Sequence, residues 1–161
     1  MSETTVQQDT SGVRFPPPLY YAIGLIAGFI VQYFYPIHLG RPGHRIIEYA
    51  LGGIWILAGL LLMGWALFTF RRAGTSPIPH VPTAALTADG PYRLTRNPTY
   101  LGMALISVGV SLAGNALWPL LSVPVALILI DRLVIRKEER YLDRKFGDAY
   151  RQYRSRVRRW I

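Results

Sequence analysis

The sequence predicts an all-α polytopic membrane protein with four transmembrane helices and a cytoplasmic, amphipathic C-terminal helical segment. The first observation is that charged side chains are absent from residues 15–40, 49–70 and 97–130. The second is the composition of the 161 residues, of which 51% are hydrophobic and 17% charged, against about 25% charged in a typical soluble domain. The third is an excess of Lys and Arg, net charge +9, that flanks the uncharged runs. Together these features disfavour a soluble helical core.

The uncharged runs define the spans, because about 20 apolar residues in a helix cross a hydrocarbon layer of about 30 Å. The first run predicts a helix over about residues 19–35, which starts after a triple proline and stops at Pro36. The second predicts a helix over about 46–70. The third is too long for one span, so we expect a helical hairpin of about 99–113 and 116–135 that turns at Gly114-Asn115.

The rest of the chain gives the domain organisation. Residues 14–161 are expected to form one membrane domain, preceded by a polar, flexible tail at 1–13. The loop 71–96 carries four arginines and the C-terminal segment 136–161 carries ten basic residues, whereas the opposite side has only Arg41 and Arg45. Because basic residues stay on the cytoplasmic side, we expect both termini and the 71–96 loop in the cytoplasm, with membrane lipids as partners.

Several classes of function are excluded or disfavoured. The chain has no cysteine, which excludes disulfides, Cys-ligated zinc, iron–sulfur clusters and thiol catalysis. Its three histidines have no metal-ligand spacing, so no metal site is predicted. The basic residues flank membrane spans and match no nucleic-acid-binding motif, so no nucleic-acid partner is expected.

The polar half contains the candidate functional residues. Pro98 is suited to begin the third helix, with Asn97 as its N-cap. The C-terminal segment has helical periodicity, interrupted by a bend at Gly147. It also holds two adjacent acids: at regular helical spacing Glu138 shares a face with Asp131 and would suit a cationic ligand, while Glu139 is placed to pair with Arg136 at the surface.

Two motifs carry a resemblance to a known family. "GPYRLTRNPTYLG", followed after a hydrophobic hairpin by "EERYLDRKFGDAYRQYRSRVRRW", resembles the isoprenylcysteine carboxyl methyltransferase family. That family is similar to other small integral-membrane methyltransferases, including phospholipid methyltransferases. The resemblance covers about residues 79–160. The family pattern Arg-His-Pro-x-Tyr stands here as Arg96-Asn97-Pro98-Thr99-Tyr100, so the ionisable imidazole is replaced by an amide.

The resemblance implies an enzyme that uses S-adenosylmethionine to methylate a lipophilic acceptor. The acceptor would be an isoprenylcysteine-like carboxylate or, alternatively, a phospholipid or another small lipophilic amine or thiol. No residue is assigned a catalytic role. Arg132 and Arg136 are the nearest candidates for binding the acceptor. The implied cofactor-binding residues are Ala84, Ala85, Leu86, Thr87, Tyr92, Asn97, Pro98, Thr99, Tyr100 and Glu138.

The residue types suit this chemistry. A carboxylate such as Glu138 can hold the cofactor's ammonium group, and aromatic faces such as Tyr92 and Tyr100 attract a sulfonium by about 0.5–2 kcal/mol. The two tyrosines are equally suited to anchor the chain at the membrane interface. Two other classes remain open: a small oligomeric transporter that uses Glu48, and a non-catalytic membrane protein that retains the family fold.

Overall fold

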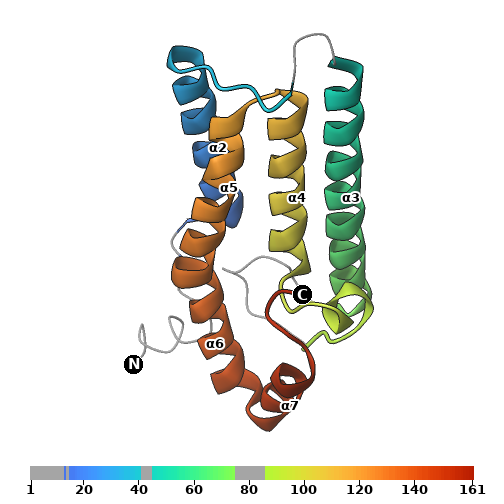
Figure 1. Ribbon diagram of the computed structural model, residues 1–161. Coiled ribbons are helices and arrows are strands. Elements are labelled where there is room, and N and C mark those ends of the chain that lie inside the picture. The colour runs from blue at the N-terminus through green and yellow to red at the C-terminus, as the bar shows by residue number, and fades with distance from the viewer. Residues whose placement is uncertain (1–12, 14, 41–44, 75–85) are drawn as a thin grey trace.

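The computed structural model describes residue 13 and residues 15–40, 45–74 and 86–161, and these residues contain helices and no strands (Figure 1). The helical elements are α2 (Pro17–Phe34), α3 (Arg45–Arg72), the short 3-10 helix η1 (Gly90–Arg93), α4 (Pro98–Ala113), α5 (Leu117–Ile130), the π-helix η2 (Asp131–Ile135), α6 (Arg136–Phe146) and α7 (Asp148–Arg156). Elements α5, η2 and α6 follow one another without a break, so they form one long helical rod, residues 117–146.

Three of the helices are long and apolar enough to cross a membrane. They are Pro17–Phe34, Arg45–Arg72 and the continuous rod Leu117–Phe146. The predicted span 99–113 is a helix as expected, α4, but it has 16 residues, or roughly 24 Å at 1.5 Å per residue. The all-helical fold is therefore confirmed, and three of the predicted spans meet the length criterion while α4 is a shorter apolar helix.

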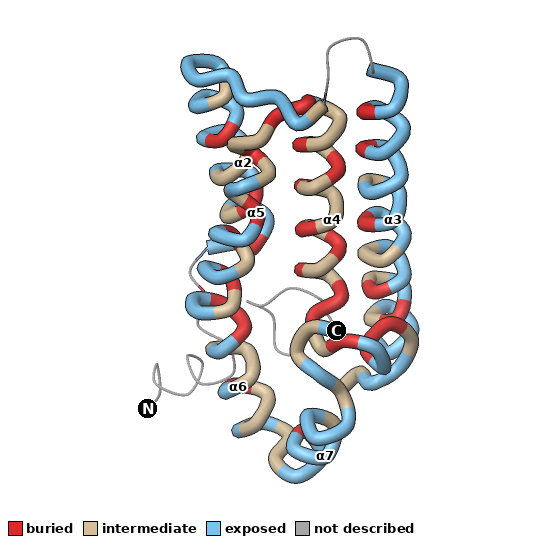
Figure 2. The backbone as a smooth tube through the Cα atoms, viewed as in Figure 1, coloured by how far each residue is buried: buried red, intermediate tan, exposed pale blue. Residues whose placement is uncertain are grey.

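The helices pack as two close pairs, α2 on α5 and α3 on α4. Buried residues gather on the faces that the helices turn toward one another, and residues on the outer faces are exposed (Figure 2). Many large hydrophobic side chains lie on those outer faces, including Ile23, Ile54 and Phe68. An apolar exterior of this extent is typical of a surface that faces lipid.

Glycines allow the close approach of α3 and α4. A Cβ atom on Gly109 would lie 2.6 Å from the Gly52 carbonyl oxygen and 2.7 Å from the Ile56 backbone nitrogen. A Cβ atom on Gly59 would lie 2.5 Å from the Gly102 carbonyl oxygen. Backbone atoms cannot move aside as a flexible side chain can, so small residues are required on this seam.

We therefore expect Gly109→Ala to lower the free energy of unfolding by about 1–3 kcal/mol, because the added methyl group forces the two helices apart. The matched control is Gly53→Ala, since a Cβ atom on Gly53 meets nothing within 4 Å. That change should be neutral or stabilise the helix by up to about 1 kcal/mol. Unfolding of both variants in mixed detergent micelles measures the difference, and equal stabilities would contradict the close packing of α3 and α4.

The turn between α4 and α5 lies where the sequence predicts it. Asn115 has a left-handed backbone, with φ +49°. Its side-chain oxygen accepts hydrogen bonds of 2.7 Å from the backbone N–H groups of Leu39 and Gly40, which ties the segment after α2 to this end of the bundle. Gly147, with φ +51°, separates α6 from α7 and so confirms the predicted bend.

The π-helix η2 changes the register of the acids that follow it. A π turn closes an i→i+5 hydrogen bond and so holds one more residue than an α turn. The expectation that Asp131 and Glu138 share a face assumed regular α-helical spacing, and it is wrong. Asp131 instead lies on the side of Glu139, because both carboxylates bind the guanidinium of Arg159.

Candidate functional site

The start of α4 and the start of α6 meet at Tyr100 and Glu138. The Tyr100 hydroxyl donates a hydrogen bond of 2.6 Å to Glu138 Oε1. Tyr21 of α2 donates a hydrogen bond of 2.9 Å to the Tyr100 carbonyl oxygen, and both tyrosines are buried. Three helices thus fix the position of one aromatic hydroxyl beside one carboxylate, 38 residues apart in the sequence.

Tyr92 joins this pair from the short helix η1. Its ring is buried and packs edge-on against Phe70 at 4.9 Å between ring centroids. Burial, with a smaller effect from the nearby Glu138 charge, raises the pKa of the phenol, and the Thr99 side chain opposes this increase. Tyr92 therefore lies close enough to Tyr100 and Glu138 for its phenol to be affected by the carboxylate charge.

The Glu138 carboxyl group has an unusual environment. It lies beyond the apolar part of the rod, which ends at Ile130. Burial raises its pKa to about 7, the Tyr100 hydrogen bond opposes this increase, and the neighbouring Glu139 charge adds to it. Among the described residues no Lys or Arg forms an ion pair with Glu138. A partly buried carboxylate without a cation is suited to bind a positively charged ligand.

Glu139 has a different environment, which corrects the predicted surface pair with Arg136. Its Oε1 lies 2.9 Å from Arg96 Nη1. Its Oε2 accepts a hydrogen bond of 2.6 Å from Arg159 Nη2, and Oε1 accepts a second from Arg159 Nε at 3.0 Å. Arg136 pairs instead with Asp131, at 3.2 Å. Glu139 is thus neutralised by two buried or half-buried arginines, and Glu138 is the acid left for a ligand.

Arg159 belongs to a C-terminal strap, residues 157–161, that crosses the start of α4. Its guanidinium group also donates to Asp131, at 3.0 Å. Its carbonyl oxygen accepts hydrogen bonds from the Thr95 hydroxyl at 3.0 Å and from the Asn97 amide at 2.9 Å. Asn97 occupies the N-cap position of α4, but its side chain makes no capping hydrogen bond, so the predicted cap is corrected to a strap contact.

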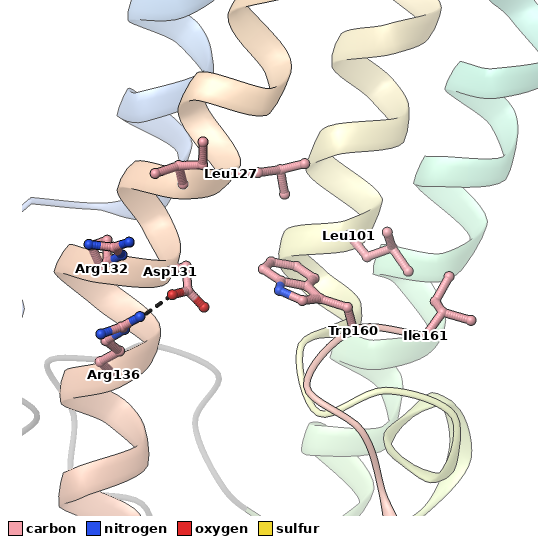
Figure 3. A pocket seen from close by; sticks show the side chains of 8 residues that line it. Leu101, Leu127, Asp131, Arg132, Arg136, Trp160 and Ile161 are labelled. Carbon is pink, nitrogen blue, oxygen red and sulfur yellow. Dashed lines mark hydrogen bonds and ion pairs between the residues drawn. The ribbon is translucent and has the colours of Figure 1, made fainter.

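A pocket of about 660 Å³ lies between α4, α5 and the strap (Figure 3), and neither Tyr100 nor Glu138 is among its lining residues. Aliphatic side chains form one part of its wall, and charged side chains from η2 and the start of α6 form another. Arg132 and Arg136, the predicted acceptor-binding residues, both line it. The lining residues are Leu101, Leu127, Ile128, Asp131, Arg132, Arg136, Trp160 and Ile161.

The predicted site residues are only partly brought together. Ala84 and Ala85 lie outside the described residues. Thr87 is described, and its hydroxyl oxygen is buried without a hydrogen-bond partner. Pro98 is buried at the first turn of α4, next to the strap contact of Asn97. No group of three His, Asp or Glu side chains in the described ranges could hold a metal ion.

Sequence reasoning missed the residues of the strap. Arg159 was visible only as one of many basic residues after the last span, and Trp160 as a terminal aromatic residue. The partners of Arg159, which are Thr95, Asn97 and Glu139, lie 64, 62 and 20 positions away. A local pattern carries no signal for such contacts, and the only pointer was the second quoted motif, which extends to Trp160.

Comparison with known proteins identifies the family. The sequence model of the phospholipid methyltransferase family matches residues 47–149, which include α4, the rod and most of α3. A protein of Haemophilus influenzae, described as uncharacterized, is 44% identical over 64 residues, which cover 98% of that protein and 38% of this chain. No solved structure matches the chain significantly.

The chain therefore belongs to the phospholipid methyltransferase family, as the resemblance of its motifs implied. Members of this family are methyltransferases, and the three long apolar helices identify this member as an integral membrane protein.

Proposed function

We propose that the chain is an S-adenosylmethionine-dependent methyltransferase that acts on a lipophilic acceptor at the cytoplasmic face of the membrane. The observation that carries the proposal is the contact between Tyr100 and Glu138, a carboxylate without an ion-pair partner among the described residues. The chain also has an amphipathic pocket, whose lining residues Leu101 and Arg136 follow Tyr100 on α4 and precede Glu138 on α6. The proposal assigns the cationic donor to Tyr100 and Glu138 and the lipid-like acceptor to the pocket.

The residues present fit the donor. When bound, S-adenosylmethionine supplies the methyl group on a sulfonium. Glu138 would hold its ammonium group, and the electron-rich faces of Tyr92 and Tyr100 would attract the sulfonium. The buried Thr87 hydroxyl, which lacks a partner within the described residues, offers a further polar contact. Asn97, Pro98, Thr99 and the stretch 84–86 complete the proposed contacts by the family resemblance.

The pocket fits an acceptor with an apolar body and an anionic group. Leu101, Leu127 and Ile128 provide an apolar wall, and Arg132 is exposed at the pocket without an acid partner in the described part of the chain. Arg132 and Arg136 would hold the anionic group. We favour a carboxylate, such as that of an isoprenylcysteine, because methylation of a carboxylate cancels charge and requires no base. A phospholipid amine or a lipophilic thiol is the alternative.

Two measurements test the proposal. Isothermal titration calorimetry in detergent should detect binding of S-adenosylmethionine to the folded protein. Transfer of tritiated methyl groups should then be followed with N-acetyl-S-farnesylcysteine, phosphatidylethanolamine and a long-chain alkyl thiol as acceptors. Methylation of the farnesylcysteine with a KM that rises in Arg132→Ala would support the favoured acceptor. A folded protein that does not bind the cofactor would contradict the proposal.

The affinity for S-adenosylmethionine should depend on pH through Glu138. Because the pKa of this group is raised to about 7, the carboxyl is mostly protonated at about pH 6 and mostly ionised at about pH 7.5. Only the ionised form attracts the ammonium group, so the affinity should rise several-fold between these values. In Glu138→Gln this increase should disappear, and a wild-type affinity that is the same at both pH values would contradict the assignment.

A further inference from the structure

We propose that Trp160 determines which apolar acceptors the enzyme accepts, an inference that rests on the proposed function. The indole extends from the C-terminal strap into the space between α4 and α5, opposite Leu127 (Figure 3). It is the largest side chain that lines the pocket, and it packs against the buried core of the bundle. A change in its size therefore changes the width of the pocket directly.

The backbone that carries the indole is held in place by the two residues that precede it. The Arg159 carbonyl oxygen accepts two hydrogen bonds from the chain segment before α4, and the Arg158 carbonyl oxygen accepts a third from the Arg96 backbone N–H at 3.0 Å. The Arg159 guanidinium group is bound to both Glu139 and Asp131. A wall held by this many directional contacts is preorganised, so it can discriminate between acceptors instead of adapting to each.

The charges of the pocket define the orientation of the occupant. Arg132 in η2 and Arg136 at the start of α6 form the charged side of the pocket, whereas Leu101, Leu127 and Ile128 form the apolar side. An acceptor whose anionic group lies against the arginines must direct its apolar body along the aliphatic side chains and the indole. Trp160 would then contact the acceptor's tail, while the reacting carboxylate lies against the two arginines.

The test is a comparison of acceptor preference in Trp160→Ala and in the wild-type protein, both reconstituted in nanodiscs. The acceptors are N-acetyl-cysteines that carry S-geranyl, S-farnesyl or S-geranylgeranyl chains. We expect the ratio of kcat/KM for the longest to the shortest chain to rise by about tenfold or more, because a wider pocket favours the bulkier tail. The change should appear mainly in KM, and the affinity for S-adenosylmethionine should be unchanged.

Two further variants keep the test decisive. Trp160→Phe retains a ring and should restore part of the wild-type preference, and it replaces the alanine variant if that protein does not fold. Trp55→Ala, which removes a lipid-facing indole on α3, is the matched control and should leave the ratio unchanged.

Unchanged ratios in both Trp160 variants would overturn the inference and leave the proposed function standing. A wild-type protein that binds S-adenosylmethionine but methylates none of the S-prenyl acceptors would overturn the inference together with the favoured acceptor. The two failures are therefore distinguishable.

Discussion

Replacement of Glu139 by alanine is expected to lower the free energy of unfolding by about 3–5 kcal/mol, the cost of removing one partner from a buried ion pair. Glu139 lies between Arg96 at 2.9 Å and Arg159 at 2.6 Å. The Arg96 side chain is 10% exposed, so loss of the carboxylate leaves a guanidinium charge in a site that excludes water. The C-terminal strap would lose one of its two acidic anchors in the same variant.

Chemical unfolding in mixed detergent micelles measures this effect. The matched control is Asp148→Ala, which breaks an exposed pair with Arg151 of similar length, 2.9 Å. Exposed pairs contribute at most about 1 kcal/mol, so the control should unfold almost as the wild type does. If Glu139→Ala and Asp148→Ala were equally stable, the ion pairs around Glu139 would not hold the strap in place.

The bounds of the helices could be predicted closely because the sequence pattern that produces each helix is local. An uncharged run of about 20 residues has few alternatives to a membrane helix. The expected spans 19–35, 46–70 and 99–113 correspond to helices Pro17–Phe34, Arg45–Arg72 and Pro98–Ala113. The turns at Asn115 and Gly147, which both have a positive φ, could also be predicted from the sequence.

The sequence predicts a cationic ligand for Glu138 and an ion pair for Glu139, but the arginines that pair with Glu139 could not be predicted. Glu138 and Glu139 are identical in type and adjacent, so only their orientation separates them. That orientation depends on the π-helix Asp131–Ile135, whose five residues carry no sequence mark that distinguishes them from an α-helix. The family resemblance implies that Tyr100 and Glu138 bind one cofactor, but their direct contact could not be predicted, since no local periodicity links two residues across an intervening helical hairpin.

The strap could not be predicted for a further reason. The sequence predicts Asn97 as a helix cap, which is what Asn before a helix usually is. Its amide instead binds the Arg159 carbonyl oxygen, and a backbone acceptor is present on every residue. A hydrogen bond of this kind forms only when tertiary packing brings one particular carbonyl within reach, so no sequence motif predicts it.

Glu138→Gln is expected to weaken S-adenosylmethionine binding by about ten- to a hundredfold, the contribution of a charge-assisted hydrogen bond of about 1.5–3 kcal/mol. Glutamine keeps the shape of the glutamate side chain and can still accept a hydrogen bond from Tyr100. The decrease in affinity therefore measures the contribution of the negative charge alone. Isothermal titration calorimetry measures it, with Asp148→Asn as a control that removes a charge far more exposed to water. An affinity within twofold of the wild type would contradict the role assigned to Glu138.

The free energy of unfolding of Glu138→Gln should change in the opposite direction from that of Glu139→Ala. The pKa of Glu138 in the folded protein, about 7, is above its ordinary value of 4.5. The folded state therefore favours the protonated form, and the stability that this gives is complete below about pH 4.5 and lost as the pH rises through about 7. Glutamine resembles the protonated form at every pH, so Glu138→Gln should be as stable as the wild type or more stable at about pH 8. The two variants would thus distinguish the adjacent acids experimentally, because Glu138→Gln loses affinity for S-adenosylmethionine whereas Glu139→Ala loses stability.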